Sequence, residues 1–414
     1  MTMRPQHRDP GLDTTTPVLL LGGAANALSL MRSFGRLGIR VGAIMRARAE
    51  LRSRYCRSPE RIPDAVDAHR YYRDRLLTAD RLLPGAVIFA CGDDAVEFVA
   101  QNHGALGEAG YILERNDPEL RLLLLDKART LELAHDAGLP TPRYWLVDGA
   151  DDWEGTVAAA EYPLILKPLD THRHHARFGH KFRVAATRES LLRHRDALAA
   201  EGMPFMLCEL VPGPDRNHVS YYTYRDEDGN ELLHFTKRCL RRRPMNEGIG
   251  TYQITENLPD VEALGKRFFA MTRYTGFGNL ELKRDERTGE LKILECNTRF
   301  TAVQEQLLAS GVNSDIIVYR DLTGQRAVPT CGAEQDVAIW WPFRDAQAFA
   351  VARASTRETW GDWRRSLSHR RVVFPYFQAS DPAPFLSLIG GQLDRAARKV
   401  AGSVGRRTTP GVRP

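Results

Sequence analysis

Two short segments in which apolar and polar residues alternate, 277–285 and 290–297, constrain the fold of this chain more than any other feature. The alternation predicts two β-strands. Between them, Arg287-Thr288-Gly289 fits a three-residue hairpin loop, with Gly289 at the position that needs a positive φ. The sequence therefore predicts an antiparallel hairpin here.

The register of this hairpin brings acidic side chains together. A three-residue loop makes Glu286 face Glu290, and therefore makes Glu281 face Glu295. Asn297 shares the face of Glu295, because side chains two apart on a strand point the same way. Two facing carboxylates repel each other, at a cost of roughly 0.2–1 kcal/mol. A divalent cation would relieve that repulsion, and two Glu with one Asn suit Mg²⁺.

Arg299 lies two residues beyond Asn297 and is placed to reach an anion that the metal holds. The alternative is a solvated hairpin face on which acidic residues meet by chance. The hairpin residues alone leave both interpretations open.

The composition is that of an ordinary globular enzyme. The 414 residues suffice for two or three domains, and 43% are hydrophobic and 27% charged. The net charge is +6, with Lys and Arg spread over the chain among Asp and Glu. Nucleic acid is therefore not implied as a partner, whereas anionic substrates are favoured.

The cysteines and the N-terminus indicate the compartment. The six cysteines form no C-x-x-C pair, which predicts buried thiols in a reducing cytoplasm. Residues 1–13 are charged and contain proline, unlike a secretory signal. The longest uncharged run, 14–31, is interrupted by Gly22-Gly23 and predicts strand, turn and helix rather than a membrane span.

The N-terminal part alternates between strand and helix patterns. Strands are expected at 17–21, 39–45, 86–90 and 111–113, with a helix at 25–37. This alternation predicts a small parallel sheet covered by helices. The first turn lacks the G-x-G-x-x-G spacing, and Arg46 stands where an NAD site needs an acidic residue, so NAD binding is disfavoured.

Three further patterns follow. A helix is expected over 120–137 and includes Lys127, and the buried strand 163–168 includes Lys167. The strand 205–211 then turns at Pro212-Gly213-Pro214-Asp215.

These elements and the Glu…Glu-x-Asn-x-Arg hairpin, in this order, resemble the ATP-grasp superfamily. Within it, the set is similar to carboxylate–amine ligases such as bacterial D-aspartate ligases and to carbamoyl-phosphate-synthase-like proteins. The resemblance covers about residues 16–324. It implies an α/β fold class, with an N-terminal parallel α/β (pre-ATP-grasp) domain followed by a two-subdomain α+β ATP-grasp fold.

The resemblance implies roles for the nucleotide-binding positions. Lys127 and Lys167 would hold the nucleotide phosphates. Glu209 and Val211 would form the hinge that recognises adenine, and Asp215 would accept the ribose hydroxyls.

The resemblance also implies roles at the reacting end. Glu281, Glu295 and Asn297 would hold two Mg²⁺, for which Mn²⁺ can substitute, between the β- and γ-phosphates. Arg299 would bind the transferring phosphoryl group.

Two segments depart from the family pattern. The His-rich segment 171–180 occupies the place of a mobile phosphate-covering loop, and Lys181 is its expected anchor. A metal site built from its histidines is the alternative. The basic run 235–244 could be solvated or bind nucleic acid, but in the family such a strand faces the acyl phosphate. Lys237 and Arg238 are therefore expected at the site, with Arg241 behind them.

The C-terminal part is less informative. Strands are expected at 336–342 and 372–375, and 388–400 could be a basic amphipathic helix that packs on the protein, is solvated or lies on a membrane surface. The expected divisions are a disordered N-terminus (1–15), an N-terminal domain (16–116), an ATP-grasp domain (117–330, lid about 160–210), an extension (331–400) and a disordered tail (401–414).

The expected activity is an ATP-dependent ligase that joins a carboxylate to an amine through an acyl phosphate and releases ADP and phosphate. The alternatives are a carboxylase or carbamoyl-phosphate-type enzyme using bicarbonate, a non-catalytic nucleotide-binding regulator, and a nucleic-acid-binding module. The expected partners are small-molecule substrates, without nucleic acid or an integral membrane segment, and a homodimer is compatible with the sequence.

Overall fold

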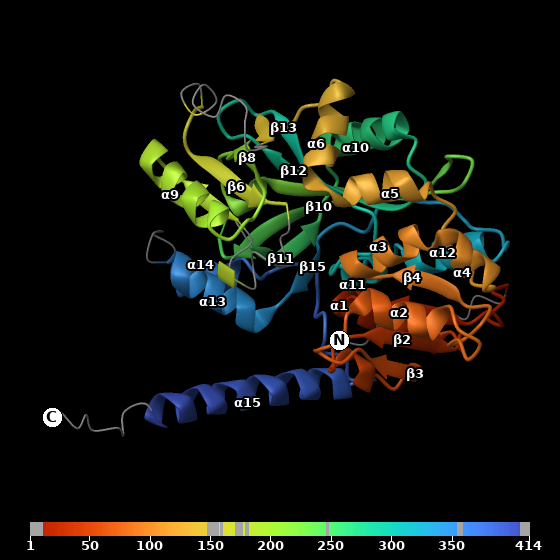
Figure 1. The fold of residues 1–414 in the computed structure, drawn as a ribbon. Coiled ribbons are helices and arrows are strands. Elements are labelled where there is room, and N and C mark those ends of the chain that lie inside the picture. The colour runs from red at the N-terminus through yellow and green to blue at the C-terminus, as the bar shows by residue number, and fades with distance from the viewer. Residues whose placement is uncertain are drawn as a thin grey trace.

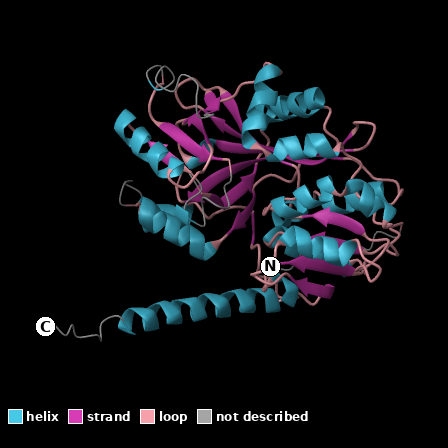
Figure 2. Cartoon of the chain, in the orientation of Figure 1, coloured by secondary structure: helices cyan, strands magenta, loops and turns pink. Residues whose placement is uncertain are grey.

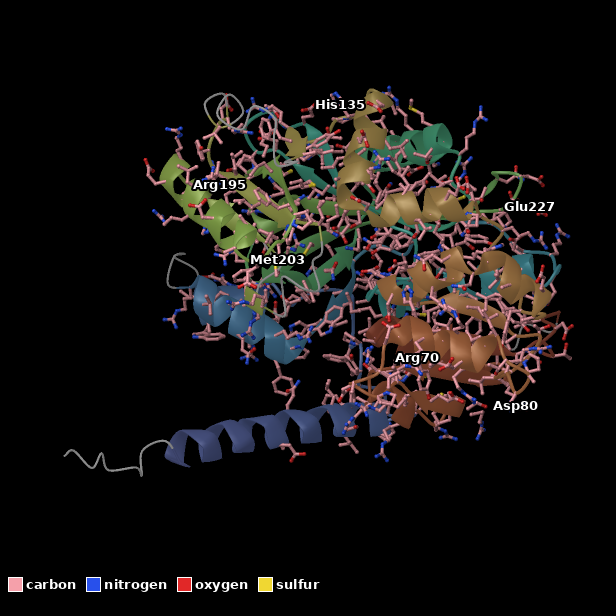
Figure 3. All side chains as sticks on the ribbon, viewed as in Figure 1. Arg70, Asp80, His135, Arg195, Met203 and Glu227 are labelled. Carbon is pink, nitrogen blue, oxygen red and sulfur yellow. The ribbon has the colours of Figure 1, made fainter. Side chains whose placement is uncertain are left out.

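The computed structural model describes residues 11–146, 157, 160–169, 177–178, 182–245, 248–353 and 359–405. Three β-sheets organise the chain (Figures 1 and 2). Side chains fill the spaces between the ribbons of the three sheets (Figure 3).

The N-terminal sheet is parallel and has the strand order β3-β2-β1-β4. Its elements are β1 (Val18–Leu21), α1 (Ala25–Arg36), β2 (Val41–Met45), η1 (Glu50–Arg52), β3 (Cys56–Arg61), α2 (Ala68–Leu76), β4 (Val87–Ala90), α3 (Asp93–Gln101) and α4 (His103–Glu108). Strands β1, β2 and β4 are buried at every residue, as expected for a parallel sheet with both faces covered. The expected strand at 111–113 forms only an isolated bridge between Ile112 and Val87.

The second sheet is antiparallel, with the order β5-β8-β6-β7, and includes the segment that the sequence predicts as a lid (yellow and green at the upper left of Figure 1). Its elements are β5 (Tyr144–Leu146), β6 (Leu164–Pro168), β7 (Arg183–Ala185), α9 (Arg188–Ala199) and β8 (Phe205–Glu209). Leu164, Leu166 and Leu207 pack against Leu191 and Leu198 of α9. The lid therefore has a core of its own.

The central sheet has the order β13-β12-β9-β10-β11-β15-β16, and β14 pairs with β10. Its strands are β9 (His218–Arg225), β10 (Glu231–Arg243), β11 (Ile249–Thr255), β12 (Gly276–Arg284), β13 (Leu291–Asn297), β14 (Thr330–Cys331), β15 (Val337–Trp340) and β16 (Arg371–Val373). The remaining elements are α5 (Pro118–Leu125), α6 (Lys127–Asp136), η2 (Asp215–Asn217), α10 (Pro259–Thr272), α11 (Gln304–Ala309), α12 (Ser314–Leu322), α13 (Pro342–Ala352), α14 (Trp360–Arg365) and α15 (Ala383–Gly405). Strands β15 and β16 extend this sheet, so the segment after residue 330 is built into it.

The two faces of the central sheet differ. Leu280, Leu282 and Tyr221 pack with Phe268 of α10 and Leu124 of α5 on one face. The other face packs partly against the N-terminal domain and α11 and partly carries charged side chains. That second face holds the candidate site.

The helix expected over 120–137 is broken in two, which corrects the sequence interpretation. Asp126 ends α5 and begins α6, with an extended backbone at φ −81° and ψ 118°. Its carboxylate accepts hydrogen bonds from the N–H groups of Ala128 (2.8 Å) and Arg129 (3.3 Å). Because an Asp in this position caps a new helix, Lys127 becomes the first residue of α6.

The hairpin also differs in detail from its prediction. Asp285, not Glu286, faces Glu290, because Asp285 N–H donates to Glu290 C=O at 2.9 Å. The register then shifts by one residue between Glu281 and Leu282, and Glu281 does face Glu295. The expected facing pair is therefore confirmed, but a β-bulge in β13 produces it rather than the loop register.

The segment before α15 joins the N-terminal domain to the rest of the molecule. Arg32 of α1 and Asp381, exposed by 0% and 1%, form an ion pair with Nε and Oδ2 2.9 Å apart. The Ser53 hydroxyl and the Arg54 N–H also donate to Asp381. Among the described residues, no helix is both long and apolar enough to cross a membrane.

Candidate functional site

Charged side chains from three parts of the chain meet at the end of the β12–β13 hairpin. Lys127 Nζ lies 2.8 Å from Glu295 Oε2. Arg299 Nε lies 2.5 Å from Asp93 Oδ1 at the start of α3. Glu281 faces Glu295 across the hairpin. The structure therefore brings together Lys127, Glu281, Glu295 and Arg299, as expected from the sequence, and adds Asp93.

These charges perturb one another. Glu295 is the largest cause that raises the pKa of Lys127, and Asp93 and Glu281 add to it. Burial lowers the pKa of Arg299, but Asp93, Glu295 and Glu281 outweigh it and the net shift is upward. The two cations thus stay charged and offset two of the three carboxylate charges.

Two asparagines set the orientation of the predicted metal ligand. Asn297 Nδ2 donates to Asn279 Oδ1 at 3.2 Å, and Asn279 Nδ2 donates to the Tyr221 carbonyl at 3.3 Å. In this arrangement both NH₂ groups are used as donors. The side-chain carbonyl oxygen of Asn297 is then the amide atom that can coordinate a metal ion.

The donor set fits Mg²⁺. Glu281, Glu295 and Asn297 offer only oxygen atoms, which Mg²⁺ prefers. In the described part of the chain, no group of three or more His, Cys, Asp or Glu could hold a metal ion. Two carboxylates suffice when substrate phosphates supply the other ligands, as is usual for Mg²⁺.

Lys237 extends the site across the sheet. Glu281 pairs with Ser220 of β9, and Ser220 pairs with Lys237 of β10, so these residues form one row. Lys237 is 5% exposed, and its Nζ donates to Gln253 Oε1 at 2.6 Å. Burial lowers the pKa of Lys237, and Glu281 opposes that shift.

Lys283 lies on the same face of the sheet, two residues along β12 from Glu281. Burial and then Arg242 lower the pKa of Lys283 to about 8. His218, which pairs with Lys283 across the strands, hydrogen-bonds to Arg242 and has its pKa lowered by burial first. The charge of Lys167 also acts on His218. Lys167 thus influences His218 electrostatically, whereas Lys127 lies beside Glu295.

Of the two expected hinge residues, Glu209 connects the predicted lid to the hairpin. Glu209 Oε1 accepts from Arg287 at 2.8 Å, and Oε2 accepts from Lys292 at 3.2 Å and from the Arg143 N–H at 3.2 Å. The Glu209 carboxylate is thus engaged by protein groups. Val211 follows it and is 3% exposed.

Asp215 is 7% exposed and accepts a hydrogen bond from the Arg242 N–H at 2.8 Å. It therefore borders the group formed by Lys283, His218 and Arg242. Its expected contact with the ribose remains a prediction.

Two other expected basic residues lie outside the charged group. Arg238 makes a two-pronged ion pair with Glu256, at 2.6 and 2.8 Å. Arg241 pairs with buried Asp345, with both distances 2.8 Å. The structure does not bring Arg238 to the hairpin carboxylates, because neighbouring residues on a strand point to opposite faces. Lys181 and most of 171–180 lie outside the described residues.

Sequence reasoning missed Asp93, Asn279, Lys283 and His218 as site residues. Asp93 and Arg299 are 206 positions apart in the sequence, so no local sequence pattern could reveal their contact. Asn279 and Lys283 had an available signal, since they lie two residues from Glu281 on either side and must share its face.

A cavity of about 430 Å³ lies elsewhere, lined by His234, Glu262 and Cys331 among others. None of the candidate site residues lines it. The chemistry argues for the hairpin instead, because the facing carboxylates and their cations are there.

No protein-family model matches the chain. Among curated proteins, the chain is 28% identical over 228 residues to the D-aspartate ligase of Enterococcus faecium, covering 51% of this chain and 53% of that protein. It is 24% identical over 297 residues to the D-alanine–D-alanine ligase of Chromohalobacter salexigens, covering 63% and 84%. The chain thus spans about half the length of the first relative.

Two solved structures show the same fold. The biotin carboxylase domain of the Hydrogenobacter thermophilus 2-oxoglutarate carboxylase superposes with a TM-score of 0.60 at 20% identity, over 77% of this chain and 73% of that chain. The L-amino acid ligase from Bacillus licheniformis superposes with a TM-score of 0.55 at 15% identity, over 75% of each chain. At these identities the likeness concerns the fold.

Proposed function

We propose that this chain belongs to the ATP-grasp superfamily and is an ATP-dependent ligase that joins a small-molecule carboxylate to an amine. The observation that carries the proposal is the group formed by Glu281, Glu295, Asn297, Lys127 and Arg299. The Glu and Asn side chains offer oxygen ligands for a metal ion, and the Lys and Arg side chains offer positive charge for phosphate. The names of the curated relatives and the L-amino acid ligase fold support the same class of reaction.

The residues divide the work between binding and transfer. Lys127, Lys167 and Lys237 would bind the nucleotide phosphates, and Lys127 would exchange its ion pair with Glu295 for a phosphate contact. Glu281, Glu295 and Asn297 would hold two Mg²⁺, or Mn²⁺ in their place. The cation supplies neutralisation of the β- and γ-phosphate charge when it is bound.

The proposed reaction has two steps. The substrate carboxylate oxygen attacks the γ-phosphorus of ATP, the bond to the bridging oxygen breaks, and ADP leaves. The amine nitrogen then attacks the carbonyl carbon of the acyl phosphate, loses a proton and displaces phosphate. Arg299, held by Asp93, would bind the transferring phosphoryl oxygens in a planar fork.

The test uses the full chain with ATP and MgCl₂ in a matrix of D- and L-amino acid pairs. We expect ADP, phosphate and a coupled product in equal amounts for at least one pair, with mass spectrometry identifying the product. D-amino acids come first because of the relatives' names. A bicarbonate arm tests the carboxylase alternative.

Glu295→Gln is the matched variant. It should keep the fold and abolish ADP formation, because it removes one of the two carboxylate charges that a metal needs. Normal turnover in a folded Glu295→Gln protein would refute the assignment. MgATP should raise the Tm of the wild type, since a ligand at 100 times its Kd stabilises by about 2.7 kcal/mol. A Tm shift without any product would favour a nucleotide-binding regulator.

A further inference from the structure

The modest net charge conceals a strong asymmetry along the chain. Residues 341–414 contain 13 Lys and Arg against 5 Asp and Glu, a net charge of +8. The preceding 340 residues contain 45 against 47, a net charge of −2. The C-terminal fifth of the chain therefore carries all of the excess positive charge.

Ion pairs to the rest of the chain increase this excess. Asp345 is 0% exposed and is paired with Arg241, and Asp381 is 1% exposed and is paired with Arg32. Both arginines precede residue 341. Two of the five acidic residues are thus buried and neutralised, so they do not offset the basic residues of the C-terminal segment.

The same segment exposes large apolar side chains. Among the described residues, twelve large hydrophobic side chains are exposed, and six of them lie after residue 341. These six are Phe343 (62%), Val351 (74%), Trp360 (44%), Phe377 (46%), Leu386 (62%) and Leu393 (65%). Scattered exposed apolar side chains are ordinary on a protein surface, whereas neighbouring ones on a single element mark an interaction surface. Leu386 and Leu393 lie on the same helix, α15.

Helix α15 carries these two exposed side chains beyond the body of the protein. It runs out from the body, and only its N-terminal end meets the rest of the ribbon (Figure 1). Leu386, Ile389 and Leu393 follow at spacings of three and four residues, so their positions share one side of the helix. The sequence then continues with Arg395, Arg398 and Lys399. An apolar stripe in a basic helix is typical of helices that lie at a membrane interface.

We propose that the C-terminal segment, through α15, binds the surface of an anionic lipid bilayer. Charge complementarity favours this partner, because basic residues next to a bilayer are attracted to anionic headgroups. The exposed aliphatic side chains favour lipid over nucleic acid, which offers them no acyl layer. Residues 383–414 have a net charge of +5, so two copies of the helix would repel each other. The inference does not depend on the catalytic activity.

The experiment is co-sedimentation of the full chain with vesicles. We expect binding to phosphatidylcholine vesicles that contain 30% phosphatidylglycerol, and little binding to pure phosphatidylcholine. Binding should weaken as salt rises from about 0.05 to 0.5 M, because the Debye length shortens.

Two variants separate the apolar and the basic contributions. Leu386→Glu/Leu393→Glu should lower vesicle binding at least about tenfold, since it places charge in the apolar stripe. Arg395→Glu/Arg398→Glu/Lys399→Glu should abolish the preference for anionic vesicles. The matched control is Val328→Glu, because Val328 is 65% exposed but lies before the basic segment. It should bind like the wild type, and MgATP should raise the Tm of all the variants.

Four results would overturn the proposal. They are absence of binding to anionic vesicles at low salt, equal binding by Leu386→Glu/Leu393→Glu, equal binding to neutral vesicles, and a loss of binding in Val328→Glu of the same size. If the leucine variant instead converts a dimer to a monomer in light scattering and vesicles do not bind, the surface belongs to a second copy. Binding to duplex DNA that survives the leucine variant, without vesicle binding, would identify nucleic acid.

Discussion

At the scale of single residues, Arg299 combines a fixed position with a group suited to phosphate. It is 20% exposed on its side chain, and Asp93 holds its Nε. Arg299→Lys keeps the charge but loses the planar fork. We expect turnover to fall by about 100-fold, as when one stabilising donor of a transition state is removed, while ATP affinity changes by a small factor.

Two measurements check this expectation: nucleotide affinity by titration, and product formation by mass spectrometry with the substrates found in the screen. Arg238→Lys is the control, because Glu256 holds Arg238 away from the hairpin carboxylates. Loss of ATP binding with full turnover at saturating nucleotide would show that Arg299 anchors the nucleotide instead.

Lys283 predicts a pH dependence. Burial and Arg242 lower its pKa to about 8, and an unfolded lysine titrates near 10.5. The unfolded state therefore binds more protons between these values, and the free energy of unfolding from this group rises with pH there. A bound anion favours the charged form, so MgATP affinity should fall as pH rises through about 8.

The measurement is the Kd for MgATP at pH 7, 8 and 9. Lys283→Met, which keeps the length of the side chain, should bind more weakly at pH 7 and lose the pH dependence. An unchanged pH profile in the folded variant would place Lys283 outside the nucleotide site. Lys266→Met is the control, since Lys266 pairs with Glu262 on α10.

The sequence predicted part of this residue-level picture. The period of two in a strand placed Glu281, Glu295 and Asn297 on one face, and the structure agrees. Asp93 could not be found in this way, because it begins helix α3, far from the hairpin in sequence. The position of Arg238 was misjudged because adjacent basic residues on β10 point to opposite faces, and only Lys237 points to the carboxylates.

At the scale of elements, local irregularities decide where the site residues lie. A β-bulge near Leu294 shifts the register so that Glu281 and Glu295 lie opposite each other. Asp126 caps α6 and so places Lys127 in the first turn of that helix. Alternation and helical period predict the elements but not these one-residue shifts, which depend on hydrogen bonds between segments. Strand β3 was missed because its sequence is polar and it lies at a sheet edge.

The connection between lid and hairpin gives an element-scale prediction. Glu209 is 6% exposed and bonds to Arg287 and Lys292 of the hairpin. Burial raises its pKa, but those partners outweigh it and the net shift is downward. This contribution to stability is therefore present above about pH 4.5 and is lost as pH falls through the lowered value.

Glu209→Gln should weaken the attachment of the predicted lid by about 1–3 kcal/mol, because Arg287 and Lys292 lose one charged acceptor and keep Asp285 as their other one. Hydrogen exchange should then be faster in β5, β6 and β8 than in the central sheet. Glu161→Gln is the control, because Glu161 is 70% exposed and pairs with Arg143 at the surface. Equal hydrogen-exchange rates in the wild type and in Glu209→Gln would show that Glu209 does not hold this sheet to the hairpin.

At the scale of the whole molecule, the charged group at the hairpin includes one residue from the N-terminal domain. That domain supplies Asp93, which holds Arg299. Its α1 is tied to the segment before α15 by Arg32 and Asp381. The superfamily resemblance indicated the order of the domains, but this long-range ion pair spans 349 positions and has no local signal.

The last prediction concerns this tie. Asp381→Asn leaves the buried Arg32 guanidinium without its carboxylate, and burial already lowers the pKa of Arg32. Breaking a buried pair in this way costs about 3–5 kcal/mol, so the Tm should fall by several degrees. ADP formation should fall with it at temperatures where the wild type is active, because a displaced N-terminal domain removes Asp93 from Arg299. Asp394→Asn, on the exposed part of α15, is the matched control and should leave both the Tm and ADP formation unchanged. A wild-type Tm in Asp381→Asn would show that the hydrogen bond from the Arg32 guanidinium to the backbone C=O of residue 381, which the substitution keeps, holds the segment without the ion pair.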